Sequence, residues 1–410
     1  MTGVDPRFAG RSRSGLWAIS SVALWVTVAF LPLNPSDLDG FFWPSAQAAL
    51  AGHPLMVYQP FGGMAYPNAN GPLALIPLTA VGVVVRALGW MDILQLRRAV
   101  ALGVFSIFIL LMAREGVSAI ERLRGKPLSL WPRLLAYGAL TVAPPLWQSL
   151  AGYGHIEQPI EIWLILVAAR WLGEDRPLRA GAAFGLAVLA RTASALFWVP
   201  LALAAWRRDR RQAAGLTAAA TALVVVGILP FYLADPADVR HSLVGYRGGL
   251  SVGAGSIWTL GRGTSLEGLG QHADLVFVAV VALGLNLWLA TRPGGLSGRA
   301  LYAGLALAAA SFVLLAKAVW PYYFLEIYVF TTIWAASQTG PAARKARILL
   351  PSLLVMGLGL LAEGGVTPGL SALVVRAEGA AMFVILGAAM VWLAAAGRRT
   401  SDDGARAPGC

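Results

Sequence analysis

The chain has 410 residues, of which 58% are hydrophobic and 13% are charged, and its mean hydropathy is +0.67. Because soluble domains carry only roughly 45–50% apolar residues, this composition excludes an ordinary soluble protein. The net charge of +12 comes from short basic clusters between long apolar runs, which is typical of cytoplasmic loops and not of a nucleic-acid-binding surface. The single cysteine, Cys410, excludes a disulfide framework.

Apolar runs of about 17–22 residues recur between positions 15 and 396, and a helix of that length crosses the hydrocarbon core of a bilayer. We therefore expect an all-α polytopic protein of the cell membrane, with about 12 to 13 transmembrane helices. The basic clusters place residues 1–14 in the cytoplasm, and the run 15–33 is expected to be a retained signal-anchor helix.

The same clusters predict how the rest of the chain is divided. Residues 15–235 form an N-terminal transmembrane module that contains a first exoplasmic loop, 34–71, with short interfacial helices. Residues 236–271 form an exoplasmic loop that is expected to contact substrate, and 272–396 form the C-terminal transmembrane helices. Residues 397–410 are expected to be a disordered cytoplasmic tail.

Two regions break the regular alternation of sides. The runs 72–88 and 99–113 lie between an exoplasmic and a cytoplasmic loop, where only an odd number of crossings fits, so one of them is expected to be short, re-entrant or tilted. The run 180–205 has basic clusters at both ends and contains Arg191, which predicts two short helices joined by a turn at membrane depth. An arginine there marks a functional-site candidate. The alternative is an ordinary helix from which Arg191 reaches an interface along its aliphatic stem.

The first exoplasmic loop carries two acids, Asp37 and Asp39, separated by one residue, and then Tyr58, Tyr66 and Asn68. Aspartate is a favoured helix N-cap, and acids suit a helix N-terminus, so capping is one interpretation of this pair. Capping requires one acid and not two. The pair is therefore also a candidate for chemistry at the outer surface.

Three further groups of polar residues lie in predicted exoplasmic positions. They are His155, Glu157 and Glu161; then Arg240, His241, Tyr246, Arg247 and Arg262; and finally Lys317, Tyr322, Tyr323 and Glu326. The two glutamates of the first group are four residues apart and so share one helix face. Each group also has a structural interpretation: a helix cap at Glu157, solvated loop charges at Arg240 and Arg247, and an interfacial aromatic belt in the last group.

Acids on one exoplasmic loop, an excess of Arg and Lys on another and an arginine beneath them together favour one kind of site. Such a site holds an anionic lipid phosphate by charge-assisted hydrogen bonds while a carboxylate acts as a base. The sequence signals no other chemistry, since it has no His/Cys set with metal-ligand spacing, no phosphate-binding P-loop and no nucleophile elbow.

Three stretches carry a resemblance to a known family. "DLDGFFWPSAQAALAGHPLMVY" holds an acidic motif, a small-residue helix and a Gly-x-Pro-x-Tyr-like exit, and "YPNANGPLALIPL" follows it. "GYGHIEQPIEIWLILVAARWLGEDRPLRAGAAFGLAVLARTASALFWVPLAL" has a polar start, a basic loop and a Gly-rich short helix that ends in a cation. In this order they resemble the GT-C superfamily of membrane glycosyltransferases, in particular the mannosyltransferases of phosphatidylinositol mannosides and glycolipid anchors. The resemblance covers the first two-thirds of the chain best.

This resemblance implies an inverting enzyme that moves a sugar, expected to be mannose, from a polyprenyl-phosphate donor to a hydroxyl of a lipid-linked glycan on the exoplasmic face. Asp37 and Asp39 match the acidic pair, and Asp39 is slightly preferred as the catalytic base. Arg191 stands where the family often has Lys, and would hold the leaving phosphate with Arg240, Arg247 or both. Further substrate contacts are expected from His155, Glu157, His241, Tyr246, Tyr58, Tyr66, Asn68, Lys317, Tyr322, Tyr323 and Glu326. No cofactor is implied with certainty, and a divalent cation, Mg²⁺ or Mn²⁺, is compatible with the motifs.

Two other functions fit parts of the pattern. A flippase or transporter of lipids or lipid-linked sugars would also use broken helices and an intramembrane arginine. However, the sequence shows no inverted repeat, and its polar residues gather on one face of the membrane. In a non-catalytic subunit of a membrane complex the two acids would be helix caps. Membrane lipids are expected partners in every case, and nucleic acid in none.

Overall fold

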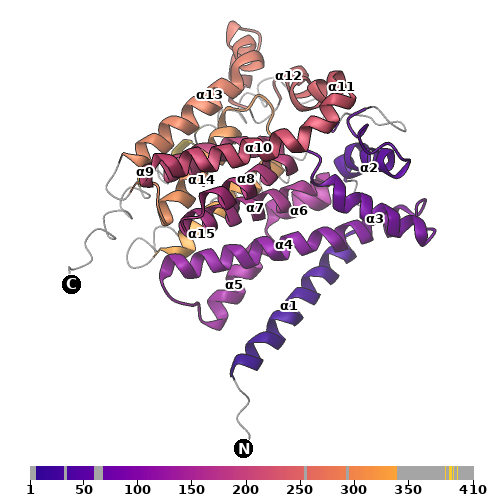
Figure 1. The fold of residues 1–410 in the computed structure, drawn as a ribbon, viewed down its shortest axis with the longest axis horizontal. Helices are drawn as coiled ribbons and strands as arrows, with labels where there is room; N and C mark the ends of the chain where they lie inside the picture. The colour runs from indigo at the N-terminus through magenta and orange to yellow at the C-terminus, as the bar shows by residue number, and fades with distance from the viewer. Residues whose placement is uncertain are drawn as a thin grey trace, which may run out of the picture.

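The computed structural model describes residues 6–31, 35–59, 68–253, 256–291 and 295–338, and isolated helical positions at 384, 387–389, 391 and 395. Every regular element in these ranges is helical, as expected (Figure 1). Three described helices are long and apolar enough to cross a membrane: α4 (Leu94–Arg124), α10 (Arg210–Ala234) and α13 (Ser265–Ala290). They are consistent with a multi-pass membrane protein, although they are fewer than the 12 to 13 spans expected. Tyr66 and the tail 397–410 lie outside the described residues.

The remaining α-helices are shorter, and α1, with 23 residues, is the longest of them. They are α1 (Pro6–Val28), α2 (Trp43–Leu50), α3 (Leu75–Ala87), α5 (Leu130–Thr141), α6 (Pro144–Trp147), α7 (Glu157–Gly173), α8 (Pro177–Ala190), α9 (Trp198–Arg208), α11 (Pro236–Arg240), α12 (Tyr246–Gly249), α14 (Arg299–Leu315) and α15 (Phe324–Ser337). Single turns of π- or 3₁₀-helix join several of them, including η1 (Leu38–Phe42), η2 (Gln148–Tyr153), η3 (Thr192–Phe197) and η6 (Pro321–Tyr323).

A bundle built around α7 forms the centre of the molecule. Helix α7 packs between α4 and α8, and α15 packs against α4 and α14. Both α7 and α15 are apolar on nearly every side and are almost completely buried, as helices at the centre of a bundle are. Helix α10 lies close against α8 because Gly181 and Gly185 of α8 let the backbones meet. A Cβ atom at Gly181 would lie 2.2 Å from the carbonyl oxygen of Leu216, so these small residues set the packing.

The run 180–205 is broken at Arg191, as predicted. Helix α8 ends at Ala190, Arg191 is extended (φ −144°, ψ 121°), and η3 leads into α9. Arg208 at the end of α9 reaches back to Asp175 before α8, at 2.9 Å, so the two outer ends lie on the same side. At 1.5 Å per residue α8 and α9 are about 21 and 16 Å long, shorter than the roughly 30 Å core of a bilayer. The two helices thus form a short hairpin, and because Arg191 is buried, its hairpin turn lies inside the bundle.

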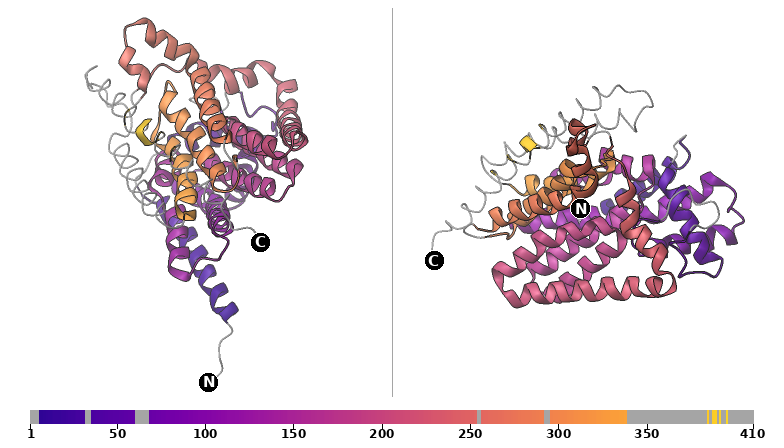
Figure 2. Two further views of the ribbon diagram at one scale, coloured as in Figure 1. Left: turned by 90° about the vertical axis from the view of Figure 1, so that its left-hand side faces the viewer. Right: turned by 90° about the horizontal axis from the view of Figure 1, so that it is seen from above.

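The uncertain region 72–113 contains one short and one long helix. Helix α3 has 13 residues and packs against α2 and α4, whereas residues 99–113 lie within the continuous 31-residue α4. At about 20 Å, α3 is shorter than the hydrocarbon core of a bilayer, so it matches the short member that the sequence predicts. Helix α1 begins at Pro6, earlier than the signal-anchor run, and it projects from the bundle toward the N-terminus (Figures 1 and 2).

The first loop and the 236–271 segment lie together at one end of the bundle, where α2, α11 and α12 are seen in Figure 1. The Gln59 amide is hydrogen-bonded to Asp235, and the Ser242 hydroxyl donates to the Tyr58 carbonyl at 3.4 Å. Residues 68–73 cover the hairpin turn, since the Leu73 N–H donates to the Leu189 carbonyl at 3.0 Å. This layer covers the turn that carries Arg191.

Candidate functional site

Helix α7 begins with the polar residues that the sequence singled out. Gly154, with φ +81°, ends the preceding π-helical turn, and Glu157 starts the helix. The Glu157 carboxylate does not cap the helix. Its Oε1 lies 2.5 Å from His155 Nδ1, and its Oε2 has no hydrogen-bond partner among the described residues. The capping interpretation of Glu157 is therefore wrong, and the buried pair with His155 replaces it.

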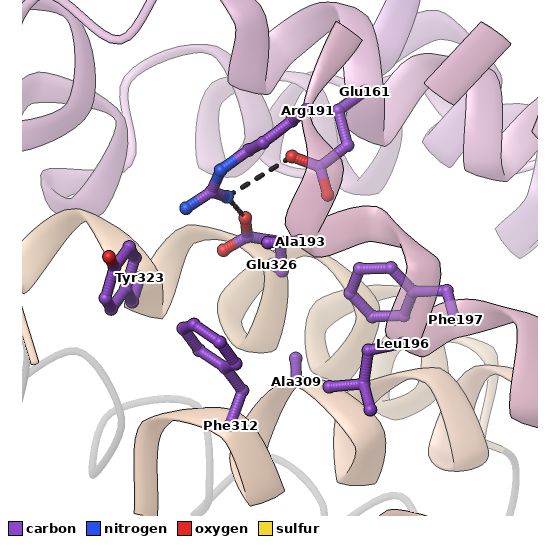
Figure 3. Close-up of a pocket in the computed structure, with 9 residues that line it drawn as sticks. All are labelled: Glu161, Arg191, Ala193, Leu196, Phe197, Ala309, Phe312, Tyr323 and Glu326. Atoms are coloured by element: carbon purple, nitrogen blue, oxygen red, sulfur yellow. Dashed lines mark hydrogen bonds and ion pairs between the residues drawn. The ribbon is translucent and has the colours of Figure 1, made fainter. Parts of the chain in front are cut away.

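Arg191 is turned into the protein, where carboxylates surround it (Figure 3). Its Nη1 is 3.2 Å from Glu161 Oε2 and is also paired with Glu326. Its Nε faces Glu157 Oε1 at 3.9 Å, and the guanidinium lies 5.3 Å from the Tyr323 ring centroid. Only 5% of the residue is exposed, so the snorkelling interpretation is wrong. Helix α7 thus brings two acids to Arg191, and α15 brings one.

The two acids of the first loop have different partners. Asp37 Oδ2 lies 2.8 Å from His155 Nε2. Asp37 stands at the N-cap position of η1, but its side chain makes no capping hydrogen bond to that turn. Asp39 instead binds two arginines of α4, with Arg97 Nη2 at 3.1 Å and Arg98 Nη2 at 2.5 Å. Asp37 therefore joins the buried group around Arg191, whereas Asp39 fastens the first loop to α4.

Together these side chains form the acidic cluster, which consists of Asp37, His155, Glu157, Glu161, Arg191 and Glu326. Aromatic rings and an amide close it on one side. The Tyr322 ring packs on the His155 ring, with centroids 3.8 Å apart, and Gln158 Nε2 donates to Glu326 Oε1 at 3.0 Å. The sequence placed Glu161 with Glu157, but gave no signal for Gln158.

Acids outnumber bases in the acidic cluster. Four carboxyl groups face two basic side chains, His155 and Arg191. Burial lowers the pKa of His155, but the carboxylates of Glu157 and Asp37 outweigh it and raise that pKa to about 9. His155 is therefore cationic at neutral pH, and it neutralises part of the charge at the outer end of the cluster.

A small pocket opens beside Arg191. Its polar wall is Glu161, Arg191, Tyr323 and Glu326, and its remaining lining is Ala193, Leu196, Phe197, Ala309 and Phe312. Figure 3 shows the ion pairs at one end and the apolar side chains at the other. Such a pocket suits a polar or charged group that is attached to an apolar chain.

Arg247 and Lys317 lie in a second group, around Asp274 of α13. Arg247 Nη2 is 2.9 Å from Asp274 Oδ2, and the Lys317 backbone N–H donates to the same oxygen at 2.9 Å. Lys317 Nζ donates to the carbonyls of Gly248 and Gln271, both at 2.9 Å. These bonds fasten the 236–271 segment to the connection between α14 and α15. The Arg247 guanidinium also lies 4.9 Å from the ring centroid of Phe312, which lines the pocket.

The other predicted site residues lie around this centre. Tyr58 is buried and donates to the Asn70 carbonyl at 3.1 Å, and Asn68 is buried in the same loop. Tyr246 packs edge-on against Phe41, with centroids 6.5 Å apart. Arg240 and His241 are exposed, outside the acidic cluster.

Sequence reasoning missed Asp274, Arg97 and Arg98. Asp274 could have been found from the sequence, because it is an isolated acid in an apolar helix, and such acids usually have a function or a charged partner. Among the described residues, no three His, Cys, Asp or Glu side chains are placed to hold a metal ion.

A comparison with protein-family models gave no match, and no curated protein matches the chain. The functional assignment therefore depends on the chemistry of the acidic cluster and its pocket.

Proposed function

We propose that this chain is an inverting glycosyltransferase that moves a sugar, with mannose the first candidate, from a polyprenyl-phosphate donor to a lipid-linked acceptor at the exoplasmic face. One observation carries the proposal. An acid of the first loop, Asp37, contacts His155 at the outer end of a buried cluster whose inner end holds Arg191. A base and a phosphate-binding cation thus belong to one connected group, as a single displacement at a sugar phosphate requires.

Asp37 is the base in this proposal, in place of the Asp39 preferred from the sequence. Its side chain is 15% exposed, so an acceptor hydroxyl can reach it, whereas Glu157 is completely buried. Asp39 already accepts hydrogen bonds from two guanidinium groups, so an acceptor hydroxyl would have to displace an arginine to reach it. The Asp37 carboxylate takes the hydroxyl proton, and His155 holds that carboxylate in position.

Arg191 holds the departing phosphate. A phosphate leaving group needs little protonation, but its charge needs a cation in a site shielded from water. Arg191 and Tyr323 line the pocket, and its apolar wall suits the first isoprene units of a donor. Arg247 closes the same pocket from outside through Phe312. Attack from the Asp37 side and departure toward Arg191 invert the anomeric carbon.

The test is a transfer assay with purified protein, radiolabelled polyprenyl-phosphate mannose and a panel of mannosylated lipid acceptors. Asp37→Asn is expected to reduce transfer by roughly 10²–10⁴-fold, the usual contribution of a positioned base. Asp39→Asn is the matched control, because it removes an acid of the same loop that lies outside the acidic cluster. Loss of transfer with Asp39→Asn and not with Asp37→Asn would reverse the assignment of the base.

A proton-linked flippase for lipids is the second candidate, and one observation favours it. The acidic cluster runs as a chain of titratable groups from the partly exposed Asp37 to the buried Glu326, and such chains occur in proton-coupled transporters. Movement of a fluorescent polyprenyl phosphate across proteoliposomes, without sugar transfer from any donor in the panel, would favour this function over the first.

A further inference from the structure

The guanidinium group of Arg191 is already occupied in this structure. Glu161 and Glu326 share its Nη1, and Glu157 faces its Nε at 3.9 Å. A phosphate cannot bind to Arg191 without displacing at least one of these carboxylates. The displaced carboxylate would remain within a wall of alanine, leucine and phenylalanine side chains, where an unpaired charge is costly.

Glu161 adds a second, independent observation. It is completely buried, it lines the pocket, and its Oε1 has no hydrogen-bond partner among the described residues. The Ser194 hydroxyl, which lies beside Glu161, donates to the Ala187 carbonyl at 3.2 Å. The pocket thus holds a carboxyl oxygen without a hydrogen-bond partner among the described residues, at a place where two acids share one nitrogen of a single arginine.

The groups that face this pair come from every element packed around it. They are His155, Glu157 and Gln158 at the start of α7, Arg191 and Ser194 at the hairpin turn, and Tyr322 and Tyr323 of η6. Helix α14 contributes only the apolar Ala309 and Phe312. His155 is held by Asp37 and Glu157, so it cannot neutralise a carboxylate released at the inner end. The apolar lining offers few oxygen ligands for a metal ion, whereas a proton needs none.

We propose that Glu161 and Glu326 form a proton-accepting pair that occupies Arg191 in the free protein, and that a phosphate binds there only as this pair takes up a proton. In the exchange, a phosphate oxygen replaces Glu326 on Nη1, and the released carboxylate accepts one proton from solvent and becomes a neutral acid. The only bond formed is the O–H bond of the released carboxylic acid, its proton comes from solvent, and the net charge of the pocket does not change. This inference rests on the proposed function, because it assumes a phosphate ligand, and it adds how that ligand gains access to the cation.

The first experiment measures the protons taken up on binding. The probe is a farnesyl phosphodiester of mannose, because the single charge of a phosphodiester does not titrate near neutral pH. Calorimetric titrations in two buffers of different ionisation enthalpy should show uptake of about one proton per ligand, and the affinity should rise about tenfold for each unit that the pH falls. Binding with no proton uptake would overturn the inference and leave the glycosyltransferase proposal standing.

Variants identify the groups involved. Glu326→Gln should bind the probe at least about tenfold more tightly above neutral pH, since one competitor for Arg191 loses its charge, and it should take up less than half a proton. The matched control is Glu115→Gln, which changes another buried acid that pairs with arginines, Arg122 and Arg170 at 2.8 Å, and should leave proton uptake unchanged. Equal effects of the two variants would contradict the inference.

Two further outcomes separate the inference from the function. Wild-type binding with proton uptake but no sugar transfer supports the inference and opposes the glycosyltransferase. Absence of probe binding at any pH, or binding that follows sodium and not protons, overturns the inference. Infrared spectra of the wild-type protein add a readout that needs no variant, because probe binding should increase the carbonyl band of a protonated carboxylic acid.

Discussion

Removal of the cation of the acidic cluster should be among the most destabilising single changes in this protein. Arg191→Met keeps a side chain of moderate length and apolar character but removes the charge. Glu161 and Glu326 then face each other at the hairpin turn without a cation, and Glu157 keeps only its pair with His155. None of these residues is more than 4% exposed, so water cannot replace the lost partner.

The size of the effect follows from this burial. Removal of one partner of a buried ion pair typically costs about 3–5 kcal/mol, because it leaves an uncompensated buried charge. Neutralising an acid as well should recover part of the loss, so the double variant Arg191→Met with Glu326→Gln should be about 1–3 kcal/mol more stable than Arg191→Met alone. Glu326→Gln by itself should cost little, since Gln158 already donates a hydrogen bond to this side chain.

Thermal unfolding of the purified protein in detergent, followed by tryptophan fluorescence, measures these differences. Arg191→Met should lower the apparent Tm by about 5 °C or more. Arg176→Met is the control, because this arginine pairs with Glu174 at 3.5 Å while half of its side chain is exposed, and surface pairs contribute roughly 0–1 kcal/mol. A Tm for Arg191→Met that equals that of the control, or a double variant less stable than the single one, would refute the reasoning.

Three other changes test different contacts. Gly71→Ala should abolish stable folding or lower the apparent Tm strongly, because its Cβ would lie 2.1 Å from the Leu189 carbonyl oxygen; an unchanged Tm would mean that this close approach is not required. Asp39→Asn should cost about 1–3 kcal/mol of stability while sugar transfer is retained, since this side chain fastens the first loop to α4. The ion pairs of His155 should stabilise the protein fully below about pH 6.5, its unfolded value, and this stabilisation should be lost as the pH rises through about 9. A pH series of Tm values for the wild type and Asp37→Asn checks this, and the variant should show the smaller fall.

The hairpin at Arg191 was predictable because its signal is local. Basic residues before and after 180–205 fix both ends on one side, and 26 residues are too few for two full crossings. The helical class and the division at the first loop followed in the same way from the spacing of apolar runs. The number of membrane-spanning helices could not be predicted in this way. Helices α8, α14 and α15 are only 14 to 17 residues long, and apolar composition alone does not distinguish such helices from spanning ones.

The partners of Asp37 and Asp39 could not be predicted from the sequence. The two residues are separated only by Leu38, and a π-helical turn directs them to different neighbours. Asp39 meets two arginines that are 58 and 59 residues away, whereas Asp37 meets a histidine in the connection before α7. Which acid is buried with a base and which is neutralised by arginine depends on tertiary packing that leaves no trace in local spacing.

A comparison between two buried ion-pair groups supports a functional origin for the acidic cluster. At the opposite end of α7, one acid, Glu115, binds two arginines, Arg122 and Arg170. Both of its oxygens are paired, and α4 and α7 are held together, as a structural ion pair requires. In the acidic cluster the acids outnumber the arginine, because three glutamates face Arg191. Two of their carboxyl oxygens have no hydrogen-bond partner among the described residues. A purely structural role does not explain why three buried glutamates share one arginine, whereas a site that exchanges a carboxylate for a phosphate and a proton does.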